Sequence, residues 1–318
     1  MACGPGGEAV NKQAFHILFA YGTIYLVWGS TYFFIKMSVE TIPPYYLVGL
    51  RFCLGGILIL AFSLLGGRLR RPPALRELAS AFVLGTLLLT VSNNLLSAAE
   101  QRLDSYLVAL CLSSTPLLVA LYDRLLLRKH ISPLRLAGIL IGVGGVACLL
   151  YDGRSLSTSL KPEIFMVIAS MLLWALGTSL GHRLPVHRDN LVNSGLMMLL
   201  AGMTSLALAS LTGEPLVQVL GRASLRSVLG LSYLAVIGSL AFSAFTFLLS
   251  CEPAIRVVSY ALVNPVIAVL LGLLAGNEQP VPLLALGLPL TLAGLVVMLY
   301  GELLWDALRR AVPCRKKD

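Results

Sequence analysis

The chain has 318 residues, of which 57% are hydrophobic and only 12% are charged, and its formal net charge is +9. Soluble globular proteins carry about 25% charged residues, so this composition excludes an ordinary soluble domain. The excess of Lys and Arg does not indicate a nucleic-acid partner, because these residues are concentrated in alternate loops between long apolar runs.

Ten apolar runs follow one another along the chain, each close to the roughly 20 residues that a helix needs to cross a bilayer. We predict membrane-spanning helices over 15–36, 44–66, 77–98, 104–127, 133–151, 162–183, 191–212, 227–250, 254–276 and 283–304. The runs are continuous and do not alternate as the strands of a membrane barrel do. The predicted fold class is therefore all-α, an integral membrane protein with ten transmembrane helices.

A repeat divides these helices into two halves of five. Four proline and glycine positions recur at a constant offset of 149 residues: Pro116 with Pro265, Pro133 with Pro282, Gly138 with Gly287, and Gly145 with Gly294. Because five is an odd number, the second half enters the membrane upside down relative to the first, which is typical of inverted-repeat carriers. We predict a cytosolic tip at 1–14, a first repeat at 15–152, a linker at 153–161, a second repeat at 162–304 and a basic cytosolic tail at 305–318.

The basic residues also predict the orientation of the chain. They gather after the second, fourth and sixth spans and at the C-terminal tail: Arg68, Arg70, Arg71 and Arg76; Arg124, Arg128, Lys129 and Arg135; Arg183 and Arg188; Arg309, Arg310, Arg315, Lys316 and Lys317. Cytoplasmic loops of membrane proteins carry an excess of Lys and Arg, so both termini are expected in the cytoplasm.

Polar and aromatic residues within the predicted spans are the candidates for a substrate cavity. They are Trp28, Ser30 and Thr31 in the first span, Asn93 in the third, Trp174 and Thr178 in the sixth, and Tyr260 and Asn264 in the ninth. Serine and threonine in membrane helices more often serve close packing or bond back to the backbone. The asparagine amides need partners, so we expect them in a cavity or in an interhelical network.

Arg51 is the one cation well inside a predicted span, where a charged residue is costly. Two interpretations stay open at this point. The side chain either reaches the external interface along its own aliphatic stem, or it faces a cavity and pairs with a carboxylate of the substrate. Pro116 and Pro265 likewise mark either hinges beside a cavity or simple packing kinks, and their paired positions in both halves favour hinges.

Several functions are made less probable by what the spans do not contain. No Asp or Glu falls near the middle of a span, which argues against a proton relay at the midplane. Glu100, Glu252 and Glu278 are instead expected to cap helix ends. The four histidines form no ligand cluster and no catalytic motif is present, so no metal, cofactor or enzymatic activity is expected.

Several motifs resemble one known family. The motifs are Trp28-Gly29-Ser30-Thr31-Tyr32, Ala99-Glu100 with Ser105 and Ala109-Leu110, Pro116-Leu117, and the stretch from Tyr260 through Asn264-Pro265 to Gly272. Together they are similar to the EamA-type branch of the drug/metabolite transporter superfamily. The resemblance extends over 15–304 and implies two inverted five-helix repeats around a central cavity. It also matches Arg51 and Asn93 to an arginine and an asparagine of the family pattern. Gly276-Asn277-Glu278 keeps the family's acidic residue but departs from its usual Leu-Gly-Glu.

The resemblance implies an exporter of amino acids, other small metabolites or drugs in a bacterial inner membrane. We therefore predict a secondary carrier whose partners are a small amphipathic substrate and the lipid bilayer, with no nucleic acid; the oligomeric state is left open. One alternative is an importer or exchanger of nucleotide-like or phosphorylated metabolites, which would need more cavity cations than Arg51. Another, of a different class, is a membrane enzyme or a scaffold without transport activity.

Overall fold

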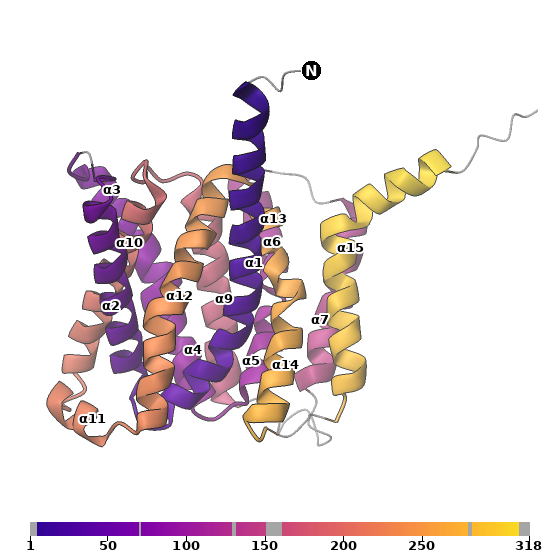
Figure 1. Cartoon of the computed structure of the whole chain (residues 1–318). Helices are drawn as coiled ribbons and strands as arrows, with labels where there is room; N and C mark the ends of the chain where they lie inside the picture. Colours follow the sequence, from indigo (N-terminus) through magenta and orange to yellow (C-terminus); the bar gives the residue numbers. More distant parts are fainter. Residues whose placement is uncertain (1–4, 70, 129–131, 151–160, 279–281, 312–318) are drawn as a thin grey trace, which may run out of the picture.

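The structure is a computed structural model that describes residues 5–69, 71–128, 132–150, 161–278 and 282–311, and in these ranges every regular element is helical (Figure 1). The first half contains α1 (Pro5–Val39), α2 (Pro44–Leu65), α3 (Leu75–Gly85), η1 (Thr86–Val91), α4 (Ser92–Glu100), α5 (Ser105–Leu112), α6 (Thr115–Leu127) and α7 (Pro133–Leu150). The second contains α9 (Pro162–Gly181), α10 (Asn190–Ser210), α11 (Leu216–Arg222), α12 (Leu225–Cys251), α13 (Ala254–Val257), η2 (Val258–Leu262), α14 (Asn264–Ala275) and α15 (Leu284–Ala311).

The predicted fold class is confirmed. Nine helices or continuous helical runs among the described residues are long and apolar enough to cross a membrane. The remaining predicted span coincides with α7, whose described apolar part, Pro133–Gly145, is shorter. Their side chains leave many large apolar groups exposed along the outside of the bundle, including Phe62 and Leu274. Such a surface is stable in contact with lipid rather than water.

The described ends of the chain are helical. Helix α1 begins at Pro5, so most of the tip predicted at 1–14 is helical, and α15 continues to Ala311 within the tail predicted at 305–318. The linker predicted at 153–161 lies outside the described residues except for Lys161. Helix α1 begins and α15 ends at the same face of the bundle, the upper one in Figure 1.

Three of the spans are irregular. The third changes from α-helix to π-helix over Thr86–Val91 and returns to α-helix at Ser92. The fourth is broken between α5 and α6, and Pro116 stands in the first turn of α6. The ninth passes through the 3-10 helix η2 before α14, and Pro265 stands in the first turn of α14. A proline cannot donate a backbone hydrogen bond, so it fits the first turn of a helix and not its interior.

The repeat is also visible in the backbone at the ends of these two broken spans. Arg128 follows α6 and Asn277 follows α14, and both adopt the left-handed conformation with φ of 53°. These residues are separated by the same offset that relates Pro116 to Pro265. The two halves therefore end their proline-broken span with the same turn.

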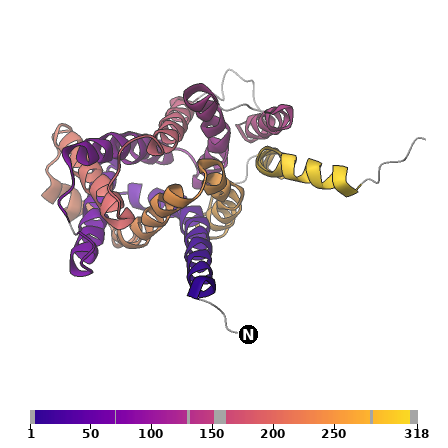
Figure 2. The ribbon, with the colours of Figure 1, turned by 90° about the horizontal axis from the view of Figure 1, so that it is seen from above.

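Three pairs of helices, each with one helix from either half, hold the two halves together. Helix α2 packs along α10 and α1 packs along α12, which joins the first half to the second. Helix α7 packs along α15, and this pair lies at one side of the molecule in both views (Figures 1 and 2). Small residues let membrane helices approach closely. At the α7–α15 contact, a Cβ on Gly138 would lie 2.6 Å from the backbone nitrogen of Met298.

Candidate substrate cavity

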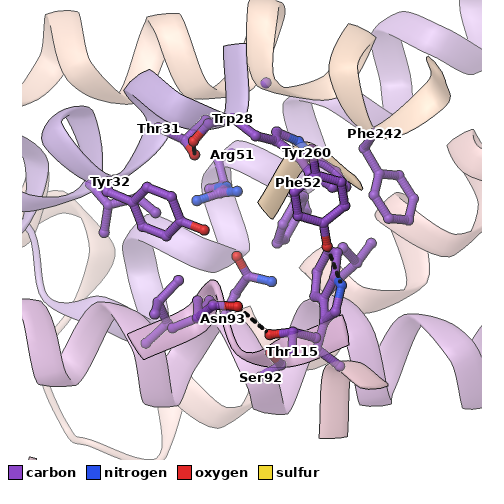
Figure 3. A pocket seen from close by; sticks show the side chains of 16 residues that line it. Trp28, Thr31, Tyr32, Arg51, Phe52, Ser92, Asn93, Thr115, Phe242 and Tyr260 are labelled. Atoms are coloured by element: carbon purple, nitrogen blue, oxygen red, sulfur yellow. Dashed lines mark hydrogen bonds between the residues drawn. The ribbon is translucent and has the colours of Figure 1, made fainter. Parts of the chain in front are cut away.

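A cavity lies between the two halves, bounded by the irregular third, fourth and ninth spans and by α1, α2, α9 and α12. Its empty volume is about 640 Å³, which includes open solvent at its mouth. The side chains that line it are Trp28, Thr31, Tyr32, Ile35, Arg51, Phe52, Leu89, Ser92, Asn93, Leu96, Leu112, Thr115, Trp174, Phe242 and Tyr260, with Gly238 (Figure 3). The lining is thus mostly apolar and aromatic, with a few polar groups.

Aromatic side chains from both halves form one wall of the cavity. The Trp28 ring from α1 lies perpendicular to the Tyr260 ring from η2, with 4.8 Å between the centroids, and edge-on to the Trp174 ring from α9 at 5.5 Å. Phe245 of α12 packs behind them, 5.0 Å from Trp28. The Trp174 Nε1–H donates a hydrogen bond of 3.2 Å to the Tyr260 hydroxyl. Edge-to-face pairs of this kind fix ring orientations.

Arg51 of α2 points into this cavity (Figure 3). The residue is 7% exposed, and its guanidinium carbon lies 4.4 Å from the centroid of the Phe52 ring. Its Nε and Nη1 atoms have no hydrogen-bond partner in the structure. Of the two interpretations of Arg51 that the sequence left open, the geometry therefore favours the cavity cation over a side chain that reaches the external interface. An arginine presents paired N–H groups that match a carboxylate.

The polar side of the cavity comes from the π-helical part of the third span. The Asn93 amide nitrogen donates to the Leu88 carbonyl at 2.7 Å, across the π-helical turn. This bond uses the nitrogen, so the Asn93 oxygen is the group that can accept a hydrogen bond from a ligand. The neighbouring Ser92 hydroxyl is shared with Ser170 of α9 at 2.8 Å, which ties the third span to the second half.

The structure brings together six of the nine predicted site residues: Trp28, Thr31, Arg51, Asn93, Trp174 and Tyr260. The other three face helix contacts. Ser30 shares a hydrogen bond of 2.7 Å with the Tyr233 hydroxyl, and Thr178 bonds back to the Trp174 carbonyl. The Asn264 amide nitrogen, in the orientation that satisfies its surroundings, donates to the carbonyls of Tyr25 and Tyr260 at 3.1 and 3.2 Å. Asn264 thus holds the break of the ninth span against α1.

Three aromatic residues of this region were not predicted from the sequence, and the environment of a fourth residue was not foreseen. Phe52 and Phe242 line the cavity, and Phe245 supports its aromatic wall. Phe242 and Phe245 are one helical turn apart in α12, and this spacing was a signal that could have drawn attention to them. The fourth residue is Glu100, which the sequence suggested as a helix cap and which is completely buried. No group of three or more possible metal ligands occurs among the described residues.

A membrane-spanning bundle in which two five-span halves enclose an apolar cavity with one buried cation defines a carrier-like membrane protein. The chain belongs to the EamA-like transporter family, whose match covers residues 16–151 and 161–300. This is a family of transporters and not of enzymes, so the chain is a multi-pass membrane transporter. The resemblance inferred from the sequence is thereby confirmed.

The comparisons with individual proteins agree. The chain is 37% identical over 301 residues to the Uncharacterized inner membrane transporter YedA of Escherichia coli (strain K12), covering 93% of this chain and 94% of that protein. It is 24% identical over 285 residues to the chloroplastic WAT1-related protein At3g02690 of Arabidopsis thaliana, covering 87% and 68%. A protein of known crystal structure shares the fold with a TM-score of 0.65 and 23% identity, over 89% of this chain and 96% of the other.

Proposed function

We propose that the chain is a secondary transporter that moves a small amphipathic compound carrying a carboxylate, with export as its direction. The observation that carries the proposal is the buried Arg51 guanidinium, which has two unpartnered nitrogen atoms and lies beside aromatic rings contributed by both halves. The cation would bind the carboxylate, and the wall of Trp28, Trp174 and Tyr260 would hold the apolar part. The Asn93 oxygen would accept a hydrogen bond from a donor group of the compound.

Movement across the membrane would occur by alternating access. The two repeats, at 15–152 and 162–304, would rock around the cavity and close it first on one side and then on the other. Pro116 and Pro265 stand where the fourth and ninth spans are already broken, so these breaks would serve as hinges. The support for this mechanism is that the aromatic wall is shared between the repeats and would be separated or reformed by their relative motion.

We place the protein in the inner membrane of a bacterial cell, with both termini in the cytoplasm. The name of the Escherichia coli relative supports the membrane, and the alternate loops rich in Lys and Arg support the orientation. A nucleotide-like or phosphorylated substrate is less well supported. Such an anion carries more than one charge, while Arg51 is the one Lys or Arg among the described residues that line the cavity.

Counterflow in liposomes tests the proposal. The purified full-length chain would be reconstituted and screened with radiolabelled amino acids, aromatic and aliphatic monocarboxylates and nucleotides. We expect saturable counterflow for at least one monocarboxylate, reduced at least tenfold in Arg51→Met and retained in Arg102→Met, whose side chain is exposed and paired with Glu163 outside the cavity. Counterflow of nucleotides alone, or equal activity in both variants, would contradict the proposed recognition.

A further inference from the structure

A buried carboxyl group lies outside the cavity lining, at the end of α4. Glu100 has no exposed surface, and neither of its carboxylate oxygens has a hydrogen-bond partner. An ionised carboxylate that is buried without a donor or a paired cation is strongly disfavoured, whereas the protonated form carries no net charge. The position therefore either holds a proton or must obtain a cation from its surroundings.

Four groups that can carry charge face Glu100 from the elements around it. They are Lys36 and the Tyr32 hydroxyl of α1, Arg51 of α2, and Glu278 in the turn after α14. The Lys36 ammonium donates to the Leu103 carbonyl at 2.7 Å and makes no ion pair with Glu100. Arg51 makes none either, because its Nε and Nη1 and both oxygens of Glu100 are unpartnered.

Glu278 is the second carboxylate of this group, and its hydrogen bonds distinguish it from Glu100. Its Oε1 accepts from the Ser105 N–H at 2.8 Å and its Oε2 from the Tyr106 N–H at 3.3 Å, at the start of α5. Two backbone donors at a helix N-terminus thus hold the Glu278 carboxylate, whereas Glu100 has no donor. The negative charge of Glu278 opposes a second negative charge on Glu100, so of these two acids Glu100 is the one to bind a proton.

We propose that Glu100 is a proton-binding site, and that its protonation leaves Arg51 free to bind the carboxylate of a substrate. The inference rests on the proposed role of Arg51 in the cavity. With Glu100 ionised, the Arg51 guanidinium, two of whose nitrogens have no partner, turns toward it, which removes it from the cavity. With Glu100 protonated, Arg51 keeps the position seen in Figure 3. A proton on Glu100 and an anionic substrate on Arg51 therefore bind together.

This coupling has a thermodynamic signature. If one proton must bind for Arg51 to be released, the affinity for a carboxylate falls as the pH rises, by about tenfold per pH unit above the titration of Glu100. Three ring compounds of similar shape separate charge from packing: benzoate, the neutral benzamide and the cationic benzylamine. Benzoate binding should show the full pH dependence, benzamide binding should not change with pH, and benzylamine should not bind more tightly at low pH.

Two measurements on the full-length protein test the proposal. The first is infrared difference spectroscopy between high and low pH, which needs no ligand and detects the carbonyl stretch of a protonated carboxyl group. The other acids of the chain also take up protons at low pH, but a carboxyl group without hydrogen bonds absorbs at a higher frequency than a hydrated one. This high-frequency band should be present in the native chain, absent in Glu100→Gln and retained in Glu163→Gln, a control acid that pairs with Arg102. The second is benzoate binding, which in Glu100→Gln should be independent of pH and as tight as native binding at low pH.

The outcomes separate this inference from the proposed function. A high-frequency band that persists in Glu100→Gln, or no such band in the native chain, would overturn the proton site even if counterflow of monocarboxylates is observed. Equal pH dependence of benzoate binding in the native chain and in Glu100→Gln would also overturn it. Absence of counterflow with the expected infrared band would contradict the transport proposal and leave the proton site supported. The amide of glutamine resembles the protonated acid, and a melting temperature close to the native value would show that the variant folds.

Discussion

The Glu278 carboxylate, which follows the ninth span, accepts a hydrogen bond of 2.8 Å from the backbone N–H of Ser105, where the fourth span begins. The bond crosses from one repeat to the other. The free N–H groups of a helix N-terminus carry partial positive charge, so an ionised acid stabilises them. The contact fastens the two repeats together at the face of the bundle opposite to the start of α1 (Figure 1). In this chain Glu278 therefore joins the end of the ninth span to the start of the fourth.

The first prediction concerns this contact. Glu278→Gln removes the charge and leaves one weaker acceptor for the Ser105 and Tyr106 N–H groups. A hydrogen bond to a charged group contributes about 1.5–3 kcal/mol, so hydrogen exchange of these amides should accelerate by roughly 10- to 100-fold. Hydrogen exchange followed by mass spectrometry over the start of α5 would measure it.

Two further variants check that the effect is local. Glu302→Gln removes an acid paired with Arg135 on α7 and should leave exchange in α5 unchanged. Gly272→Ala should reproduce the effect of Glu278→Gln, because a Cβ on Gly272 would occupy the place of the Glu278 carboxylate. Unchanged hydrogen exchange in both Glu278→Gln and Gly272→Ala would show that the Glu278 carboxylate does not stabilise the start of α5.

The second prediction concerns the hydrogen bond between Trp174 and Tyr260. Tyr260→Phe keeps the ring that packs on Trp28 but leaves the indole N–H without its acceptor. We expect the free energy of unfolding to fall by about 0.5–1.5 kcal/mol. Trp174→Phe and the double variant complete a cycle whose coupling energy reports the bond itself. Tyr45→Phe, at an exposed position of α2, is the matched control and should be neutral. A coupling energy of zero would show that the Trp174 N–H and the Tyr260 hydroxyl do not stabilise the protein through this hydrogen bond.

Hydropathy was sufficient to predict most of the fold, because a bilayer demands continuous apolar helices of fixed length. The breaks at Pro116 and Pro265 also follow from the residue type, since proline removes a backbone donor. The π-helix at Thr86–Val91 could not be predicted in this way. Its residues are ordinary apolar and hydroxyl side chains, and the turn also depends on tertiary contacts such as the hydrogen bond from the Thr90 hydroxyl to the Ala201 carbonyl of α10.

The cavity was only partly predictable, for a similar reason. Residue type indicated Arg51, Asn93 and the aromatic positions, because charged, amide and indole groups need partners inside a membrane. Asn264 satisfies the same need through the backbone of α1, which depends on how the helices pack. Glu100 stands at a helix end, where hydropathy suggests an interface. It is buried because other elements pack around the end of α4, which depends on the tertiary arrangement.

The third prediction concerns the stability cost of Arg51. A buried guanidinium with two unpartnered nitrogens destabilises the ligand-free protein, so Arg51→Met should raise the free energy of unfolding by about 1–3 kcal/mol while benzoate binding is lost. Arg51→Lys keeps the charge and should give no such gain. Arg102→Met removes an exposed, paired cation and should change stability by less than about 1 kcal/mol. Denaturant unfolding in detergent would compare the three, and destabilisation by Arg51→Met would show that Arg51 is a structural partner instead.

The last prediction concerns the α7–α15 pair at the edge of the bundle. Gly294 belongs to the repeated pattern, and a Cβ at this position would meet the backbone of α7, with the Gly138 carbonyl oxygen at 2.7 Å and the Gly142 nitrogen closer still. Backbone cannot move aside as a flexible side chain can, so Gly294→Ala must push the two helices apart. We expect a loss of about 1–3 kcal/mol in the free energy of unfolding.

Gly144→Ala is the matched control in α7, because its nearest neighbour would be a Leu290 side-chain carbon at 3.9 Å. Thermal unfolding of the two variants should therefore separate them clearly. Equal melting temperatures would mean that α7 and α15 are not held together by this close approach, although the same glycine position recurs in both repeats.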